Sequence, residues 1–148
     1  MNHSSPSKSD GNDNAGIRVL AVMPSDQDGD MLDRMLPRPE WSFNRARNVT
    51  AALTQLHDYG RQPALVLCDG DSVGSAWKEI LGRLQKMDKP PLLIVTSRLA
   101  DEQLWAEALN LGAYDVLAKP FEPSEVRRTL NAASMRWQMD SRRAQAIF

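Results

Sequence analysis

Residues 64–69 constrain the fold of this chain more than any other segment. They form a run of apolar residues that ends on the carboxylate Asp69, with Pro63 before the run and Gly70 after it. A short run that is apolar on both faces and bounded by turn residues indicates a buried strand of a parallel sheet. Asp69 then lies where open α/β sheets bind ligands, although alone it would equally suit the start of a solvated turn.

Length and composition narrow the class of protein. With 148 residues, 42% of them apolar, the chain is expected to form one globular domain. A net charge of −1 gives no electrostatic reason to expect nucleic acid or an anionic membrane as a partner. The single cysteine, Cys68, lies in the apolar run, so we expect a buried thiol and no disulfide. No segment is long and apolar enough for a membrane span, and the cytoplasm is the expected location.

Strands and helices are expected to alternate along the chain. The predicted strands are residues 17–22, 41–46 (at a sheet edge), 64–69, 92–96 and 114–118. Residues 23–30 are predicted to be a polar loop before a helix with apolar positions at Met31, Leu32, Met35 and Leu36. Asn48 is expected to cap the second helix, and Trp77, Ile80, Leu81 and Leu84 mark the third.

The last two helices carry the remaining apolar stripes. Leu104, Ala108 and Leu111 are expected to share the inner face of the fourth helix, which ends at Gly112. The final helix begins at Pro123, and its stripe runs through Val126, Leu130, Ala133 and Trp137. Residues 17–135 are thus predicted to be the folded domain, after a disordered tail at 1–16. Residues 136–148 would extend the last helix with nothing in this chain to pack against, so that they pair with a second copy, lead into an output domain or fray.

Three polar residues end three of these strands. Alternating strands and helices with short loops predict a parallel sheet covered on both faces. Asp69, Thr96 and Lys119 would then meet at one edge of this α/β sheet. A nucleophilic carboxylate beside a hydroxyl and an ammonium suits a phosphoryl group, because the lysine and hydroxyl donate to its oxygens and the aspartate can accept it.

Three other sequence features give no support for a further functional site. Asp26, Asp28 and Asp30 have the spacing of the first ligands of an EF-hand, but Gly29 comes too early and Pro37 replaces the bidentate glutamate. His57 has no acidic or serine partner nearby in the sequence and is expected to be an exposed surface residue. The loop after the first strand has neither dinucleotide-binding glycines nor a P-loop lysine, which argues against a nucleotide-binding enzyme.

The chain resembles the receiver domains of bacterial two-component response regulators. The resemblance is carried by residues 63–69, 93–97 and 108–121, the last with Gly-Ala, a short strand and then Lys-Pro-Phe. It implies a flavodoxin-like three-layer sandwich, with five parallel strands in the order 2-1-3-4-5 and a cis peptide bond before Pro120. It also implies that Asp69 is the phospho-acceptor and that Thr96 and Lys119 contact the phosphoryl group. A histidine kinase or phosphotransfer protein would be the partner, and the domain would not be an enzyme toward outside substrates.

The sequence departs from that family in two places. The acidic pair that holds Mg²⁺ in receivers falls here on Met23 and Pro24, which cannot replace carboxylates as ligands. Weak Mg²⁺ binding would then depend on Asp69 and the backbone carbonyl of Asp71, with help from Asp26 or Asp28 if the loop is reshaped. Val116 occupies the position of the switch aromatic residue on the last strand.

These observations leave two functions open. The first is a phospho-accepting receiver in a phosphorelay, modified on Asp69 by a histidine kinase partner. The alternative is a pseudo-receiver, a protein-protein interaction module that does not depend on phosphorylation. In either case Trp105, Val116 and the exposed side of the last helix are expected to form a partner or homodimer surface over the fourth helix, fifth strand and fifth helix.

Overall fold

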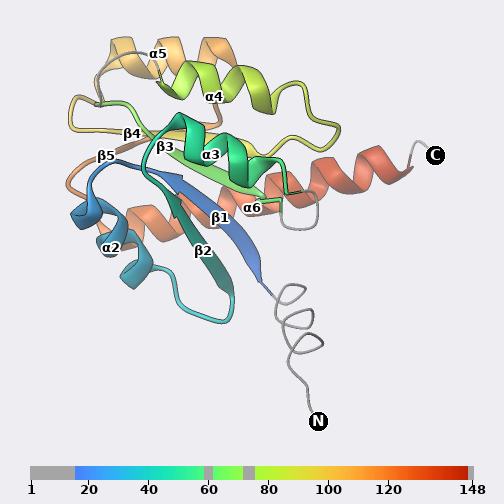
Figure 1. The fold of residues 1–148 in the computed structure, drawn as a ribbon, viewed down its shortest axis with the longest axis horizontal. Coiled ribbons are helices and arrows are strands. Elements are labelled where there is room, and N and C mark those ends of the chain that lie inside the picture. Colours follow the sequence, from blue (N-terminus) through green and yellow to red (C-terminus); the bar gives the residue numbers. More distant parts are fainter. Residues whose placement is uncertain (1–15, 59–61, 72–75, 147–148) are drawn as a thin grey trace.

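Five parallel strands form the central sheet of the protein (Figure 1). A computed structural model describes residues 16–58, 62–71 and 76–146, so the tail expected at 1–16 lies almost wholly outside the described residues. The strands are β1 (Ile17–Val22), β2 (Trp41–Ala46), β3 (Leu65–Asp69), β4 (Leu92–Ser97) and β5 (Asp115–Ala118). Their spatial order is β2-β1-β3-β4-β5, which confirms the predicted flavodoxin-like topology with β2 at an edge.

Helices cover both faces of this sheet, as Figure 1 shows. They are α2 (Asp26–Met35), α3 (Val49–Leu56), α4 (Ala76–Leu84), α5 (Glu102–Leu111) and α6 (Pro123–Ala146). Helices α2 and α6 pack on one face, and α3, α4 and α5 pack on the other. Within the described residues, no helix combines the length and the apolar character needed to cross a membrane.

The strand β3 lies at the centre of the core. All five of its residues are buried, and β1 and β4 flank it on either side. Its side chains alternate between the two apolar clusters, with Leu65 and Leu67 facing α2 and α6 while Val66 and Cys68 face α3, α4 and α5. Burial on both faces explains why the run is continuously apolar, and it brings Asp69 to the edge where β4 and β5 also end.

The first helix begins earlier than the sequence suggested. Residues 23–30 were expected to form a loop, but α2 starts at Asp26, and the side chain of Ser25 caps it by accepting from the amide of Asp28. A serine N-cap followed by carboxylates in the first turn is favourable, because these groups satisfy and complement the unpaired amides of the helix start. This correction moves the acidic residues from a loop onto a helix.

The expectations for α5 and α6 hold in part. Gly112 ends α5 with a φ of +112°, a left-handed conformation that favours glycine. Leu111 is exposed rather than inward, and the buried residue of α5 is Ala108. Trp137 packs partly buried against the core cluster, so the expectation that nothing lies under α6 beyond about Arg136 is wrong for this residue.

Candidate functional site

The three polar strand ends meet as predicted. Asp69 and Thr96 are paired in register at the ends of β3 and β4, and both are buried. Lys119 follows β5, where its backbone amide donates to the carbonyl of Ser97 at 2.9 Å. The Lys119–Pro120 peptide bond is cis, as the resemblance implied. The carboxyl ends of β3, β4 and β5, which we call the rim, therefore carry a carboxylate, a hydroxyl and an ammonium.

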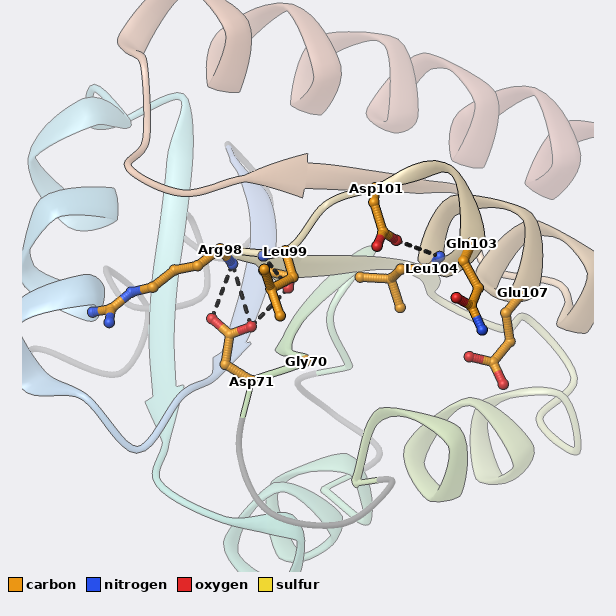
Figure 2. Close-up of a pocket in the computed structure, with 9 residues that line it drawn as sticks. Gly70, Asp71, Arg98, Leu99, Asp101, Gln103, Leu104 and Glu107 are labelled. Atoms are coloured by element: carbon orange, nitrogen blue, oxygen red, sulfur yellow. Dashed lines mark hydrogen bonds between the residues drawn. The ribbon is translucent and has the colours of Figure 1, made fainter.

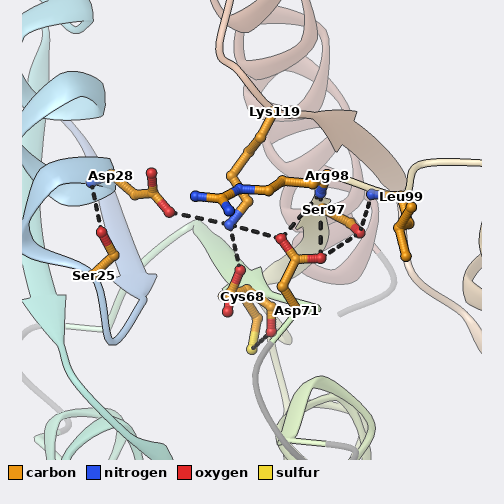
Figure 3. Close-up of polar contacts among 9 residues, drawn as sticks. Ser25, Asp28, Cys68, Asp71, Ser97, Arg98, Leu99 and Lys119 are labelled. Atoms are coloured by element: carbon orange, nitrogen blue, oxygen red, sulfur yellow. Dashed lines mark hydrogen bonds and ion pairs between the residues drawn. The ribbon is translucent and has the colours of Figure 1, made fainter.

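Lys119 contacts three carboxylates rather than one (Figure 3). Its Nζ lies 2.6 Å from Asp69 Oδ1, 3.0 Å from Asp71 Oδ2 and 3.1 Å from Asp28 Oδ2. The side chain of Lys119 is only 6% exposed, as is that of Asp69. We call these four residues the Lys119 cluster. Burial alone would lower the pKa of Lys119, but the hydrogen bonds to Asp69, Asp71 and Asp28 outweigh it and raise the pKa well above its ordinary value.

Only one of the two candidate acidic residues of α2 enters this cluster. Asp28 reaches Lys119 from the first turn of the helix. Asp26 instead pairs with Arg47 at 2.9 Å, in an exposed ion pair near the ends of β1 and β2. The sequence could not distinguish the two residues, because the choice depends on where the helix begins. Once the helix is known to begin at Asp26, Asp28 falls one turn before the inward residues Met31 and Leu32 and therefore on the inner side of α2.

The side chain of Asp71 was missed by sequence reasoning, which assigned only its backbone carbonyl. Asp71 Oδ1 accepts from the hydroxyl of Ser97 at 2.7 Å, and its carboxylate also accepts from the amide of Arg98. Burial would raise the pKa of Asp71, but these hydrogen bonds and the ammonium of Lys119 hold it below its ordinary value. The signal in the sequence was the position of Asp71, two residues after Asp69 on the same rim. The role of its carbonyl stays a prediction.

The hydroxyl of Thr96 has no hydrogen-bond partner among the described residues, although it is completely buried. A buried hydroxyl is usually paired, so this unpaired one, in register with Asp69, is a candidate donor to a group bound at Asp69. Cys68, next to Asp69, is buried as expected, and burial together with the Asp69 charge raises the pKa of its thiol to about 12. Because almost none of this thiol is ionised near neutral pH, we interpret Cys68 as a core residue and not as a nucleophile.

The two residues assigned to a switch or interface, Val116 and Trp105, are not members of the Lys119 cluster. Val116 is partly buried on β5 and packs against the apolar cluster beneath α3, α4 and α5. Trp105 lies on α5 and is half exposed. Among the described residues, these positions form no contact with Asp69 or Lys119 through a hydrogen bond or ion pair.

Two hollows flank the Lys119 cluster. The larger, about 640 Å³, lies between the ends of β3 and β4 and the start of α5, where Asp71, Arg98, Asp101 and Glu107 line it (Figure 2). The smaller, about 380 Å³, is lined by Asp28, Lys119 and Phe121. Arg98 lines both.

The rim does not fit a magnesium ion as it is arranged. The three carboxylates converge on a point already taken by the ammonium of Lys119. Met23 is buried in the apolar core, and Pro24 is exposed and offers no side-chain donor. Magnesium needs several oxygens in nearly octahedral geometry. In the part of the chain that the structure describes, no group of three or more acidic, histidine or cysteine side chains has the geometry of a metal site.

Comparison with curated proteins identifies two relatives. The chain is 33% identical to the sensory transduction protein LytT of Bacillus subtilis over 116 residues, which cover 77% of this chain and 46% of LytT. It is 34% identical to the chemotaxis protein CheY of Thermotoga maritima over 56 residues, which cover 38% of this chain and 47% of CheY. The chain thus spans a little under half the length of each relative it matches. No protein-family model matches the sequence.

Solved structures share the fold. A CheY-like receiver domain from Methanospirillum hungatei JF-1 superposes with a TM-score of 0.72 at 18% identity, covering 84% of this chain and 98% of that one. The signal receiver domain of an HD domain-containing protein from Pseudomonas fluorescens Pf-5 gives a TM-score of 0.73 at 23% identity, covering 83% and 98%. Domains of this family are signalling modules and not catalytic enzymes. The 116-residue match to LytT, on a sheet with the CheY-like strand order, shows that this chain belongs to the response-regulator receiver domains.

Proposed function

We propose that this receiver domain accepts a phosphoryl group on Asp69 from a histidine kinase or phosphotransfer partner. The observation that supports it is the pairing of Asp69 with Lys119 at 2.6 Å, beside a buried Thr96 hydroxyl that has no partner among the described residues. A carboxylate, a cation and an available donor are the groups that such a transfer needs at its acceptor.

The proposed chemistry is a displacement at phosphorus. One oxygen of Asp69 attacks the phosphoryl group of a phosphohistidine, a P–O bond forms, and the P–N bond breaks. The imidazole leaves with the bonding electron pair and takes a proton from solvent. The phosphoryl oxygens carry negative charge throughout, so the ammonium of Lys119 stabilises them, and the hydroxyl of Thr96 donates a hydrogen bond.

A specific observation favours the alternative, a pseudo-receiver that binds partners without phosphorylation. Lys119 is already engaged by three carboxylates, and the acidic pair expected beside Asp69 is replaced by the buried Met23 and by Pro24. The negative charge of the Lys119 cluster opposes an incoming phosphoryl anion. Under this alternative the rim would be a fixed structural element, and the outer faces of the domain would carry the function.

In both cases the signal would pass to another protein in the cytoplasm. LytT is named as a sensory transduction protein, which supports a place for this chain in signal transduction. We expect a protein partner rather than nucleic acid or membrane, because the net charge is −1. A homodimer through α5, β5 and α6 is part of this proposal.

Incubation with a small phosphodonor separates the two functions. The purified protein would be treated with acetyl phosphate or phosphoramidate, with and without Mg²⁺, and analysed by intact mass. A phosphoryl adduct in the wild type that disappears in Asp69→Asn and persists in Asp88→Asn, an exposed control aspartate, would support phosphoryl acceptance. No adduct under conditions that modify an established receiver would favour the pseudo-receiver.

A further inference from the structure

The Lys119 cluster contains more negative than positive charge. It holds three carboxylates, from Asp28, Asp69 and Asp71, around one ammonium. Carboxylates this close repel one another, and two of them can stay ionised only when a cation or several hydrogen-bond donors lie between them. Asp71 has further donors in Ser97 and Arg98, whereas for Asp28 and Asp69 the described side-chain donor is Lys119.

The ammonium is saturated by these contacts. A lysine side chain has three N–H donors and no acceptor. Each of the three carboxylates lies within 3.1 Å of Nζ, so every donor has one charged acceptor. The backbone amide of Lys119 is fixed to Ser97, and the side chain is 6% exposed. The ammonium therefore sits in a defined place between the carboxylates and does not sample solvent.

We infer that the ammonium of Lys119 is the resident cation of this rim and takes the place that a divalent metal takes in receivers with the acidic pair. Asp28 of α2 acts as a ligand of this internal cation, although nothing in the sequence aligns it with the missing pair. The inference goes beyond phosphoryl acceptance, because a pseudo-receiver would carry the same internal cation. It explains how the domain keeps three carboxylates together while Met23 and Pro24 occupy the positions of metal ligands.

The first test measures divalent-ion binding in the wild type and in Lys119→Met. Thermal unfolding and calorimetric titration would be run with millimolar MgCl₂ against NaCl of equal ionic strength. The wild type should not respond, because the ammonium of Lys119 already occupies the position between its three carboxylates. Lys119→Met should be less stable without the ion and should bind Mg²⁺ at least about tenfold more tightly than the wild type, because three uncompensated carboxylates attract the cation. The double variant Lys119→Met with Asp28→Asn should lose most of that gain.

The second test does not depend on the folding of Lys119→Met. The ammonium of Lys119 should give a signal in ¹⁵N-selective NMR, because it is buried and protected from exchange with solvent. Asp28→Asn should shift this signal, and Asp26→Asn, in the same helical turn but paired with Arg47, should not. Wild-type Mg²⁺ binding as tight as that of Lys119→Met, or a Lys119 signal indifferent to Asp28→Asn, would overturn the inference. Neither readout involves a phosphodonor, so failure here is distinguishable from failure of phosphoryl acceptance.

Discussion

Asp28 Oδ2 lies 3.1 Å from Lys119 Nζ, although the two residues are 91 positions apart in the chain. The contact joins the first turn of α2 to the end of β5. Both side chains are mostly buried, at 15% and 6% exposure, so the pair is shielded from the screening that makes surface ion pairs weak. The start of α2 is thereby held against the strand ends that carry Asp69 and Thr96.

The stability of the domain should depend on this contact. Asp28→Asn is expected to lower the free energy of unfolding by about 1 kcal/mol, because the amide is a weaker acceptor for the ammonium. Asp26→Asn is the matched control, since it removes the same charge from the same first turn and so loses the same interaction with the helix dipole. Urea unfolding of both variants measures the difference. Equal losses would mean that only the helix end matters.

Much of the fold could be predicted because buried strands and capped helices have recognisable sequence patterns. The apolar run that ends at Asp69 and the caps Asn48 and Gly112 are local signals, and each matches the structure. The meeting of Asp69 and Lys119 also follows from strand order alone. Their positions at strand ends required no knowledge of side-chain contacts.

The rest depended on geometry that no local pattern encodes. Ser25 was not recognised as an N-cap, so Asp26 and Asp28 were assigned to a loop, where the phase of the helix could not separate them. Leu111 matched the spacing of an inner face, but in the structure this residue at the end of α5 is exposed and Ala108 is the buried one. Trp137 packs partly buried against the core cluster and lines a small hollow with Lys89 and Pro90, which are far away in sequence.

The free energy of unfolding at acidic pH should depend on the ionisation of Asp71. Its folded pKa is held below the ordinary value of 3.8, so its contribution to stability is present above that pH and is lost as pH falls through the folded pKa. The free energy of unfolding of the wild type should therefore fall more steeply below about pH 4 than that of Asp71→Asn. Asp88→Asn, an exposed substitution outside the Lys119 cluster, serves as the control. Parallel acid profiles for the wild type and Asp71→Asn would contradict the assignment.

Cys68 should be inert in the folded protein. Its thiol is buried, and its pKa is raised to about 12, so almost no thiolate exists near neutral pH. A disulfide reagent such as DTNB should react with it only as fast as the protein unfolds, and denaturant should release the full reaction at once. Rapid stoichiometric reaction under native conditions would show that the end of β3 opens.

Self-association through α5 and α6 stays a prediction. Trp105 is 50% exposed on α5, and Met135 and Met139 are exposed on the face of α6 opposite its buried stripe. Sedimentation velocity should show a concentration-dependent dimer that Trp105→Ser weakens and Lys86→Ser, in a hollow lined by α3 and α4, does not. Shortening the chain at Arg136 is a poor test, because it also removes Trp137 from the core. A strict monomer at every concentration would rule out the homodimer.

Restoring the acidic pair should allow the rim to bind Mg²⁺. The loss of stability should differ between the two substituted positions. Pro24 is exposed, so Pro24→Asp should change stability by no more than about 0.5 kcal/mol. Met23 is 3% exposed in the apolar core, and Met23→Asp should cost at least about 2 kcal/mol, because a carboxylate is buried and packing is lost.

The single and double variants should therefore separate folding from function. Each added carboxylate competes with Asp28 and Asp71 for cations, and Mg²⁺ should return part of the lost stability by binding the folded state. If the proposed phosphoryl acceptance is correct, Pro24→Asp should take phosphoryl from a small donor faster than the wild type in the presence of Mg²⁺, as measured by intact mass, and Pro24→Asn should not. Tight Mg²⁺ binding by the wild type that Asp28→Asn abolishes would show instead that α2 already supplies the missing ligand.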